Sequence, residues 1–178
     1  LLDGPAVDDA GGDLLDGVEA RGLDGALAVD RLAEGVHHAA HEGLAHAIDL
    51  GHGHRQAYQG PLIGITGSNG KTTTKELCTG ILEEVGPTLA TRGNLNNNFG
   101  VPLTLLRRRE EDVFAVVEMG MNHRHEIARL CEIAEPTIGI LTNVGTAHIE
   151  FLGSREAIAE EKGDLLASLP ASGTAVVG

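Results

Sequence analysis

The chain has 178 residues, of which 26 are acidic and 13 are Lys or Arg, giving a formal net charge of −13. This acidity argues against binding to the phosphate backbone of nucleic acids, which requires a basic face. An aromatic content of 2% argues equally against binding by base stacking. No apolar run approaches the roughly 20 residues of a membrane helix, and Cys78 and Cys131 offer neither a disulfide framework nor a zinc-binding spacing. We therefore expect a cytoplasmic globular protein that binds no nucleic acid and does not insert into a membrane.

The first part of the chain differs from the rest in composition. Residues 1–60 carry 11 acidic and 3 basic side chains and few large apolar ones, so they bury little surface to offset the entropy of ordering. We expect residues 1–57 to form an irregular or weakly helical N-terminal segment, with a helix for example from Val18 to Val29. His37 and His41 share a helix face that could hold a metal, but a solvated polar stretch is the simpler interpretation.

From Pro61 onward, short apolar runs alternate with helical patterns. The apolar runs have the length and composition of buried strands. Strands that alternate with helices predict an α/β domain over residues 58–178, with a mainly parallel P-loop-type sheet covered by helices on both faces. Strands are expected at 62–66, 113–118, 137–142 and 174–177, and helices along Leu77–Val85, along Ile127–Ala134 and from an N-cap at Ser154 to about Leu169.

The loop after the first expected strand has the composition of a nucleotide-binding loop. Gly67 and Gly70 let backbone N–H groups turn toward phosphate oxygens, and the start of the next helix adds a positive dipole. Lys71 can reach the terminal phosphates, and the Thr72 hydroxyl is placed to hold Mg²⁺. The standard pattern has Gly where Ile65 stands, and an ordinary strand–helix turn is the alternative. The predicted cofactor-binding residues are Thr66, Gly67, Ser68, Asn69, Gly70, Lys71, Thr72 and Thr73.

Three later side chains are candidates for the same site. Glu118 ends a strand beside the expected phosphates and can hold a metal, although a solvated acid is the alternative. His148 follows another strand end, but by itself it favours a structural hydrogen bond over a ligand role. Lys162 lies four residues after Ile158 on an apolar helix face, where an ammonium is costly unless it is paired or chemically altered. It either extends to water or is held for chemistry, including conversion to a carbamate that can ligate metal.

Five blocks of sequence occur in a fixed order: Gly67–Lys75, Thr91–Asn97 with Gly100–Leu105, Glu118–Gly120, Asn143–His148 and Glu161–Asp164. Together they resemble the Mur ligases, the ATP-dependent amide-forming enzymes of peptidoglycan precursor synthesis. The resemblance extends from about Arg55 to Gly178. Within the family, the blocks are most similar to the member that adds the terminal dipeptide.

The resemblance implies a reaction and a role for each site residue. ATP would phosphorylate the terminal carboxylate of UDP-N-acetylmuramoyl-tripeptide, and the amine of D-alanyl-D-alanine would attack the resulting acyl phosphate. Lys71 would steady the phosphates, and Thr72 and Glu118 would bind the first Mg²⁺. His148 and Lys162, the latter as a carbamate, would serve a second metal. The implied catalytic residues are Lys71, His148 and Lys162, and the implied substrate-binding residues are Asn94, Asn97 and Asn143.

The chain departs from the family pattern at His125, where Gly is usual, and at Asp164, where Glu is commoner. Residues 1–54 do not resemble the family's amino-terminal domain and are interpreted as a remnant of it or as non-native sequence. The family's last domain is not expected within this chain, so we expect a fragment that is inactive alone and an enzyme that is monomeric. The alternatives are another Mur-type ligase, a folylpolyglutamate-type ligase, or a non-catalytic nucleotide-binding module. A folylpolyglutamate-type loop would carry Gly-Lys-Gly or Gly-Lys-Ser, and a non-catalytic module would have no need of Lys162.

Overall fold

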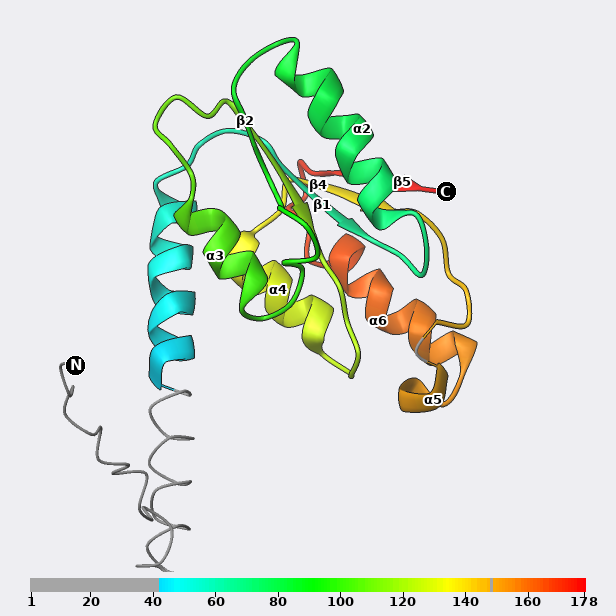
Figure 1. Ribbon diagram of the computed structural model, residues 1–178. Helices are drawn as coiled ribbons and strands as arrows, with labels where there is room; N and C mark the ends of the chain where they lie inside the picture. The colour runs from blue at the N-terminus through cyan, green and yellow to red at the C-terminus, as the bar shows by residue number, and fades with distance from the viewer. Residues whose placement is uncertain (1–41, 148) are drawn as a thin grey trace, which may run out of the picture. The chain divides into compact units, whose positions relative to one another are not determined.

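A parallel five-stranded sheet organises the computed structural model, which describes residues 42–147 and 149–178. The strands lie in the order β2-β3-β1-β4-β5, and every neighbouring pair is parallel (Figure 1). This confirms the predicted fold class for the core. The predictions for residues 18–29, for His37 and His41 and for His148 lie outside the described residues. The strands are β1 Leu62–Thr66, β2 Thr88–Ala90, β3 Phe114–Glu118, β4 Ile138–Leu141 and β5 Thr174–Val177.

Helices cover the two faces of this sheet unequally. A helix at residues 42–56 precedes β1. The helix α2 packs against β1, β2 and β3 on one face, whereas α3, α4 and α6 pack together on the other (Figure 1). None of the helices in the described ranges is long and apolar enough to cross a bilayer. The labelled helices are α2 Lys71–Glu83, α3 Gly100–Leu106, α4 Glu126–Ala134, α5 Ile149–Leu152 and α6 Arg155–Ala167.

The alternation of side chains along β1 divides the core in two. All five residues of this strand are buried, because it is the central strand and has a neighbour on each side. Leu62 joins the larger cluster beneath α3, α4 and α6, whereas Ile63 and Ile65 join a smaller cluster beneath α2. The apolar positions Ile127, Leu130, Cys131 and Ala134 of α4 all enter the larger cluster, as their helical spacing predicts.

The helix at residues 42–56 belongs to the core unit. The chain from Gly43 to Gly178 forms one compact unit, which includes all of this helix except its first residue. The Arg55 side chain donates hydrogen bonds to the carbonyl oxygens of Ala134 (2.6 Å) and Glu135 (2.8 Å) at the end of α4. Its guanidinium therefore satisfies carbonyls that have no partner within the helix, and burial lowers the pKa of Arg55. Composition alone did not reveal this contact.

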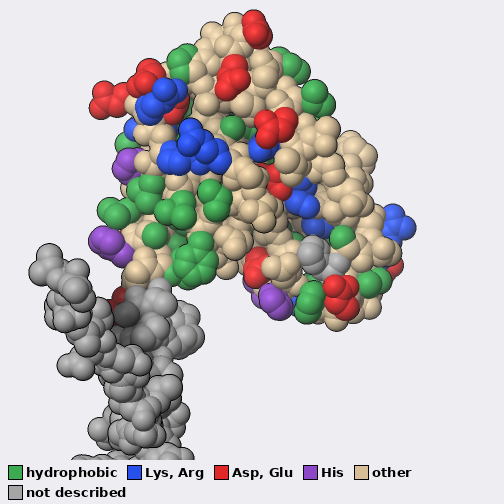
Figure 2. Space-filling view, viewed as in Figure 1, with side chains coloured by type: hydrophobic (Ala, Val, Ile, Leu, Met, Phe, Trp, Pro, Cys, Tyr) green, Lys and Arg blue, Asp and Glu red, His purple; other side chains and the backbone are tan. Residues whose placement is uncertain are grey.

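Two further details differ from the sequence expectations. The strand β2 was not predicted, because three residues after Gly86 and Pro87 are too short a run to show a strand pattern. Leu77 and Ile81 on α2 are exposed, although they share the helical stripe with Cys78 and Leu82. Val85, which the same stripe predicted to be helical, is also exposed and lies in the turn after the helix, which ends at Glu83. Figure 2 shows other apolar side chains gathered over α3, and the exposed residues in and next to that helix are Leu95, Phe99 and Leu103.

Cavity formation in the larger cluster gives a direct test of this packing. Leu130 on α4 is fully buried, so replacing it with Ala is expected to lower the free energy of unfolding by about 2–5 kcal/mol. The same substitution at Leu77 on α2, which is 63% exposed, is expected to change it by less than about 0.5 kcal/mol. Urea denaturation of the two variants measures both values. Equal losses would contradict the assignment of the core to the face beneath α4.

Candidate active site

The predicted nucleotide loop joins the carboxyl end of β1 to the start of α2. Gly67 has a φ of 149°, and a Cβ atom there would lie 1.9 Å from the Thr142 Oγ1, so only glycine fits. Gly70 has a φ of 79° and is the N-cap of α2, which has no side-chain cap. The first N–H groups of α2 are therefore left available for an anion at the positive end of the helix dipole.

The end of β4 holds this loop in place. The Asn143 side chain accepts a hydrogen bond from the Asn69 N–H (3.1 Å) and donates one to the Asn69 carbonyl oxygen (3.0 Å). The Ser68 hydroxyl accepts a hydrogen bond from the Gly145 N–H at 2.8 Å, and the Thr142 hydroxyl donates to the Asn69 carbonyl oxygen at 2.6 Å. These contacts fix the loop before any ligand binds.

A carboxylate, a hydroxyl and an amide form a chain of hydrogen bonds beside the loop. The Thr72 hydroxyl donates to Glu118 Oε2 at 2.9 Å, and the Asn96 amide donates to Glu118 Oε1 at 2.8 Å. The Glu118 side chain is 2% exposed, and no cationic side chain in the described ranges pairs with it. A hydroxyl and a carboxylate at this distance are suitable oxygen ligands for Mg²⁺, and a cation would offset the cost of the buried charge. The residues present therefore fit the metal that the sequence suggests.

A polar cleft of about 300 Å³ opens next to this group, and two lysines line it. The Lys71 ammonium folds back to donate a hydrogen bond to the Gly67 carbonyl oxygen at 2.9 Å. The Lys162 side chain is 2% exposed, and burial lowers the pKa of its ammonium to about 8, with the charge of Lys71 as a further cause. The other residues that line the cleft are Asn94, Asn96, Asn97, Gly120, Met121, Asn122 and Glu126.

The predicted site residues are distributed over three neighbouring parts of this edge of the sheet. The cleft brings Lys71, Lys162, Asn94 and Asn97 together. Thr72, in the first turn of α2 after the nucleotide loop, pairs with Glu118 at the end of β3. Asn143 contacts the loop and does not line the cleft. His148 lies outside the described residues.

Sequence reasoning did not assign a site role to Asn96 or Glu126. Asn96 lies between the two predicted substrate residues, and its contact with Glu118 is its distinguishing feature. Glu126 accepts hydrogen bonds from the N–H groups of Asn122 and His123, which fixes the turn that forms one wall of the cleft. The motif around Asn96 was visible in the sequence, but which of its amides reaches the carboxylate was not.

A larger hollow of about 850 Å³ lies elsewhere, lined by Arg55, Cys131, Glu135, Thr137 and others. Thr137 directly precedes β4, so this hollow reaches the amino-terminal edge of the sheet. It contains none of the predicted nucleotide or metal residues. Ligands of open parallel sheets bind at the carboxyl ends of the strands, so the smaller cleft is the better candidate.

The Gly-Lys-Thr loop follows the central strand of a parallel sheet, and a carboxylate ends the neighbouring strand β3. This combination defines a P-loop-type nucleotide-binding domain. The family model of the Mur ligase middle domain matches residues 65–178. The chain belongs to the Mur ligase family, which confirms the resemblance found in the sequence.

Individual relatives agree with this assignment. The UDP-N-acetylmuramoyl-tripeptide–D-alanyl-D-alanine ligase of Synechocystis sp. is 48% identical over 160 residues, covering 86% of this chain and 35% of its own. MurF from Acinetobacter baumannii superposes with a TM-score of 0.73 at 41% identity, over 75% of this chain and 30% of its own. MurF ligase from Thermotoga maritima, solved in complex with ADP, superposes with a TM-score of 0.71 at 36% identity. This match covers 75% of this chain and 31% of the Thermotoga chain. The chain thus spans about a third of the length of these relatives.

The buried Lys162 predicts a specific pH dependence of stability. Its pKa falls from 10.5 in the unfolded chain to about 8 in the folded one. Between these values the unfolded state binds the extra proton, so stability rises with pH across this window and the cost of burial is fully present below pH 8. Replacing Lys162 with Met should remove this rise, which is on the order of 3 kcal/mol. Parallel pH profiles for the parent and the variant would contradict the burial of the ammonium.

Proposed function

We propose that the complete protein is an ATP-dependent amide ligase that joins D-alanyl-D-alanine to UDP-N-acetylmuramoyl-tripeptide. The observation that carries the proposal is the pair of buried charged groups at one edge of the sheet. Glu118 and Lys162 are each 2% exposed and are joined to no oppositely charged side chain in the described ranges. Such charges are costly unless ligands or metal ions compensate them. The acceptor and the incoming dipeptide are those in the name of the Synechocystis relative.

The nucleotide loop binds the phosphates of ATP in this proposal. The backbone N–H groups that follow Gly67 and Gly70 surround the phosphate oxygens. The Lys71 ammonium leaves the Gly67 carbonyl oxygen and contacts the terminal phosphates instead. Thr72 and Glu118 hold Mg²⁺, which neutralises charge on the β- and γ-phosphates when bound. The solved ADP complex of the Thermotoga relative supports a nucleotide at this loop.

Lys162 acts on the acceptor side of the reaction. A pKa of about 8 leaves a sizeable neutral fraction of its amine near neutral pH, and only a neutral amine can add CO₂ to form a carbamate. In that form Lys162 would supply oxygen ligands and His148 a nitrogen ligand to a second metal, which would neutralise charge on the reacting groups. Asn94 and Asn97 line the same cleft and orient the carboxylate that receives the phosphoryl group. We place Asn143 at the loop, where its contacts support the nucleotide.

The proposed reaction has two chemical steps. The carboxylate oxygen attacks the γ-phosphorus in line, the bond to the bridging oxygen breaks, and ADP departs. The amine then attacks the acyl carbon, and inorganic phosphate leaves as the amide forms. Phosphoryl transfer of this kind needs alignment and charge neutralisation more than a protein nucleophile. We place the enzyme in the cytoplasm as a monomer.

Substrate dependence of ATP consumption tests the proposed reaction. The complete product of the gene that contains this segment is expected to release phosphate from ATP only when the muramoyl tripeptide and D-alanyl-D-alanine are both present. A coupled ADP-release assay with each substrate omitted in turn measures this. Equal turnover with a single amino acid in place of the dipeptide would indicate another Mur-type or folylpolyglutamate-type ligase.

Two lysine variants separate ATP binding from ligation. Replacing Lys71 with Ala is expected to weaken ATP binding, because that ammonium contacts the phosphates. Replacing Lys162 with Ala is expected to lower ligation by at least about 100-fold with nearly unchanged ATP affinity, because Lys162 acts at the second metal. Calorimetry and the ligation assay together measure both effects. Ligation that survives in the Lys162 variant would contradict the role assigned to Lys162.

A further inference from the structure

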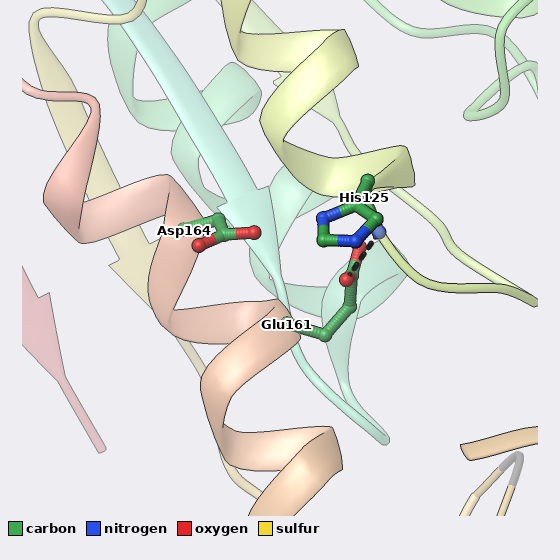
Figure 3. A group of neighbouring side chains, drawn as sticks. All are labelled: His125, Glu161 and Asp164. Atoms are coloured by element: carbon green, nitrogen blue, oxygen red, sulfur yellow. Dashed lines mark hydrogen bonds between the residues drawn. The ribbon is translucent and has the colours of Figure 1, made fainter.

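Three potential metal ligands meet between the start of α4 and α6, outside the cleft that Lys162 lines. His125 precedes α4, and Glu161 and Asp164 lie one turn apart on α6. Their donor atoms all lie within 4.8 Å of one another. Figure 3 shows the His125 ring and the Asp164 carboxylate directed toward the same space between the two helices. None of the three has a role in the proposed ligase reaction.

Two backbone hydrogen bonds fix the orientation of Glu161. This side chain is 4% exposed, and its Oε2 and Oε1 accept hydrogen bonds from the N–H groups of His125 (2.6 Å) and Ile127 (2.9 Å). An ionised carboxylate has about four acceptor positions, so each oxygen retains a free lone pair. A ligand that is already oriented by surrounding groups is the usual arrangement at a metal site.

The two other donors are free to approach a metal. No hydrogen bond within the described ranges involves the His125 ring or the Asp164 carboxylate. Both residues line a cleft of about 210 Å³ that reaches solvent, together with Arg124, Ala157 and Glu160. Zinc bonds of about 2.0–2.2 Å require donor atoms somewhat over 3 Å apart, so the side chains of His125 and Asp164 would rotate toward the ion on binding.

The backbone conformation at His125 indicates that the imidazole, rather than the backbone position, accounts for a histidine here. It has a φ of 66°, a left-handed conformation that favours glycine and is costly for a residue with a Cβ atom. A histidine at this position is destabilising for the backbone, and it contributes no cap hydrogen bond to α4. Its imidazole, however, is the one nitrogen donor beside the two carboxylates.

We propose that His125, Glu161 and Asp164 bind a divalent transition metal ion of the zinc type, which joins the start of α4 to α6. One imidazole and two carboxylates form a three-ligand set that leaves the fourth position to water. The imidazole favours zinc or cobalt over magnesium and calcium, which select oxygen ligands. The ion crosslinks the start of α4 to α6, the helix that carries Lys162, so it stabilises the segment that carries that lysine.

Zinc titration of the 178-residue chain tests the site. His37, His38 and His41 are replaced by Asn in every sample, so that zinc bound to these closely spaced histidines is not counted. Excess Mg²⁺ is present throughout. Calorimetry is expected to detect one zinc ion per chain, and Co²⁺ is expected to give visible absorption bands typical of four-coordinate geometry. His125→Gly and Asp164→Asn should each weaken zinc binding by more than about 100-fold.

The glycine variant also controls for folding. Because glycine adopts the left-handed conformation freely, His125→Gly without metal is expected to melt no lower than the parent while losing the zinc-induced rise in melting temperature. His54→Asn, a replacement outside the cluster, should keep that rise. Unchanged zinc affinity in His125→Gly and Asp164→Asn, or a parent that binds zinc no more tightly than these variants, would overturn the proposal.

Discussion

Parallel pairing of β1 with both of its neighbours is the constraint on which the site depends. The register aligns Ile65 with Glu118 on one side and Thr66 with Leu141 on the other. The residues that follow these pairs must therefore emerge at the same edge of the sheet. This alignment brings the loop after β1, the carboxylate that ends β3 and the asparagine that follows β4 within hydrogen-bonding distance. A shift of register by one residue would turn Glu118 to the opposite face.

The same edge of the sheet carries buried charged and polar groups whose burial lowers the stability of the fold. A carboxylate and an ammonium are buried there without partners of opposite charge among the described residues. The hydroxyl of Thr66 is also buried without a hydrogen bond. Proteins keep such costs where a ligand or a reaction uses them. The apolar clusters beneath the helices supply the stability that offsets them.

The helices α4 and α6 connect this edge to the rest of the core. Leu130 and Ile158 are buried in one cluster, which fixes the two helices relative to the sheet. Glu161 then binds the first N–H groups at the start of α4, and the next residue along α6 is Lys162. The position of Lys162 thus depends on packing and on a buried carboxylate that does not itself take part in the proposed reaction. A metal ion bound between His125 and Asp164 would reinforce this connection.

The sequence by itself determined the strands at 62–66 and 174–177, the N-cap at Ser154, the nucleotide loop and the family. These follow from local patterns: apolar runs, glycines at turns and short motifs in a fixed order. Only the tertiary structure decided that Leu77 on α2 is exposed and that Arg55 belongs to the core. It also decided that Asn143 holds the loop and that His125 faces Asp164. The contacts of Arg55, Asn143 and His125 join residues far apart in the chain, and local periodicity contains no information about which distant partners meet. For the same reason the stripe on α2 could not show which of its apolar residues would be covered.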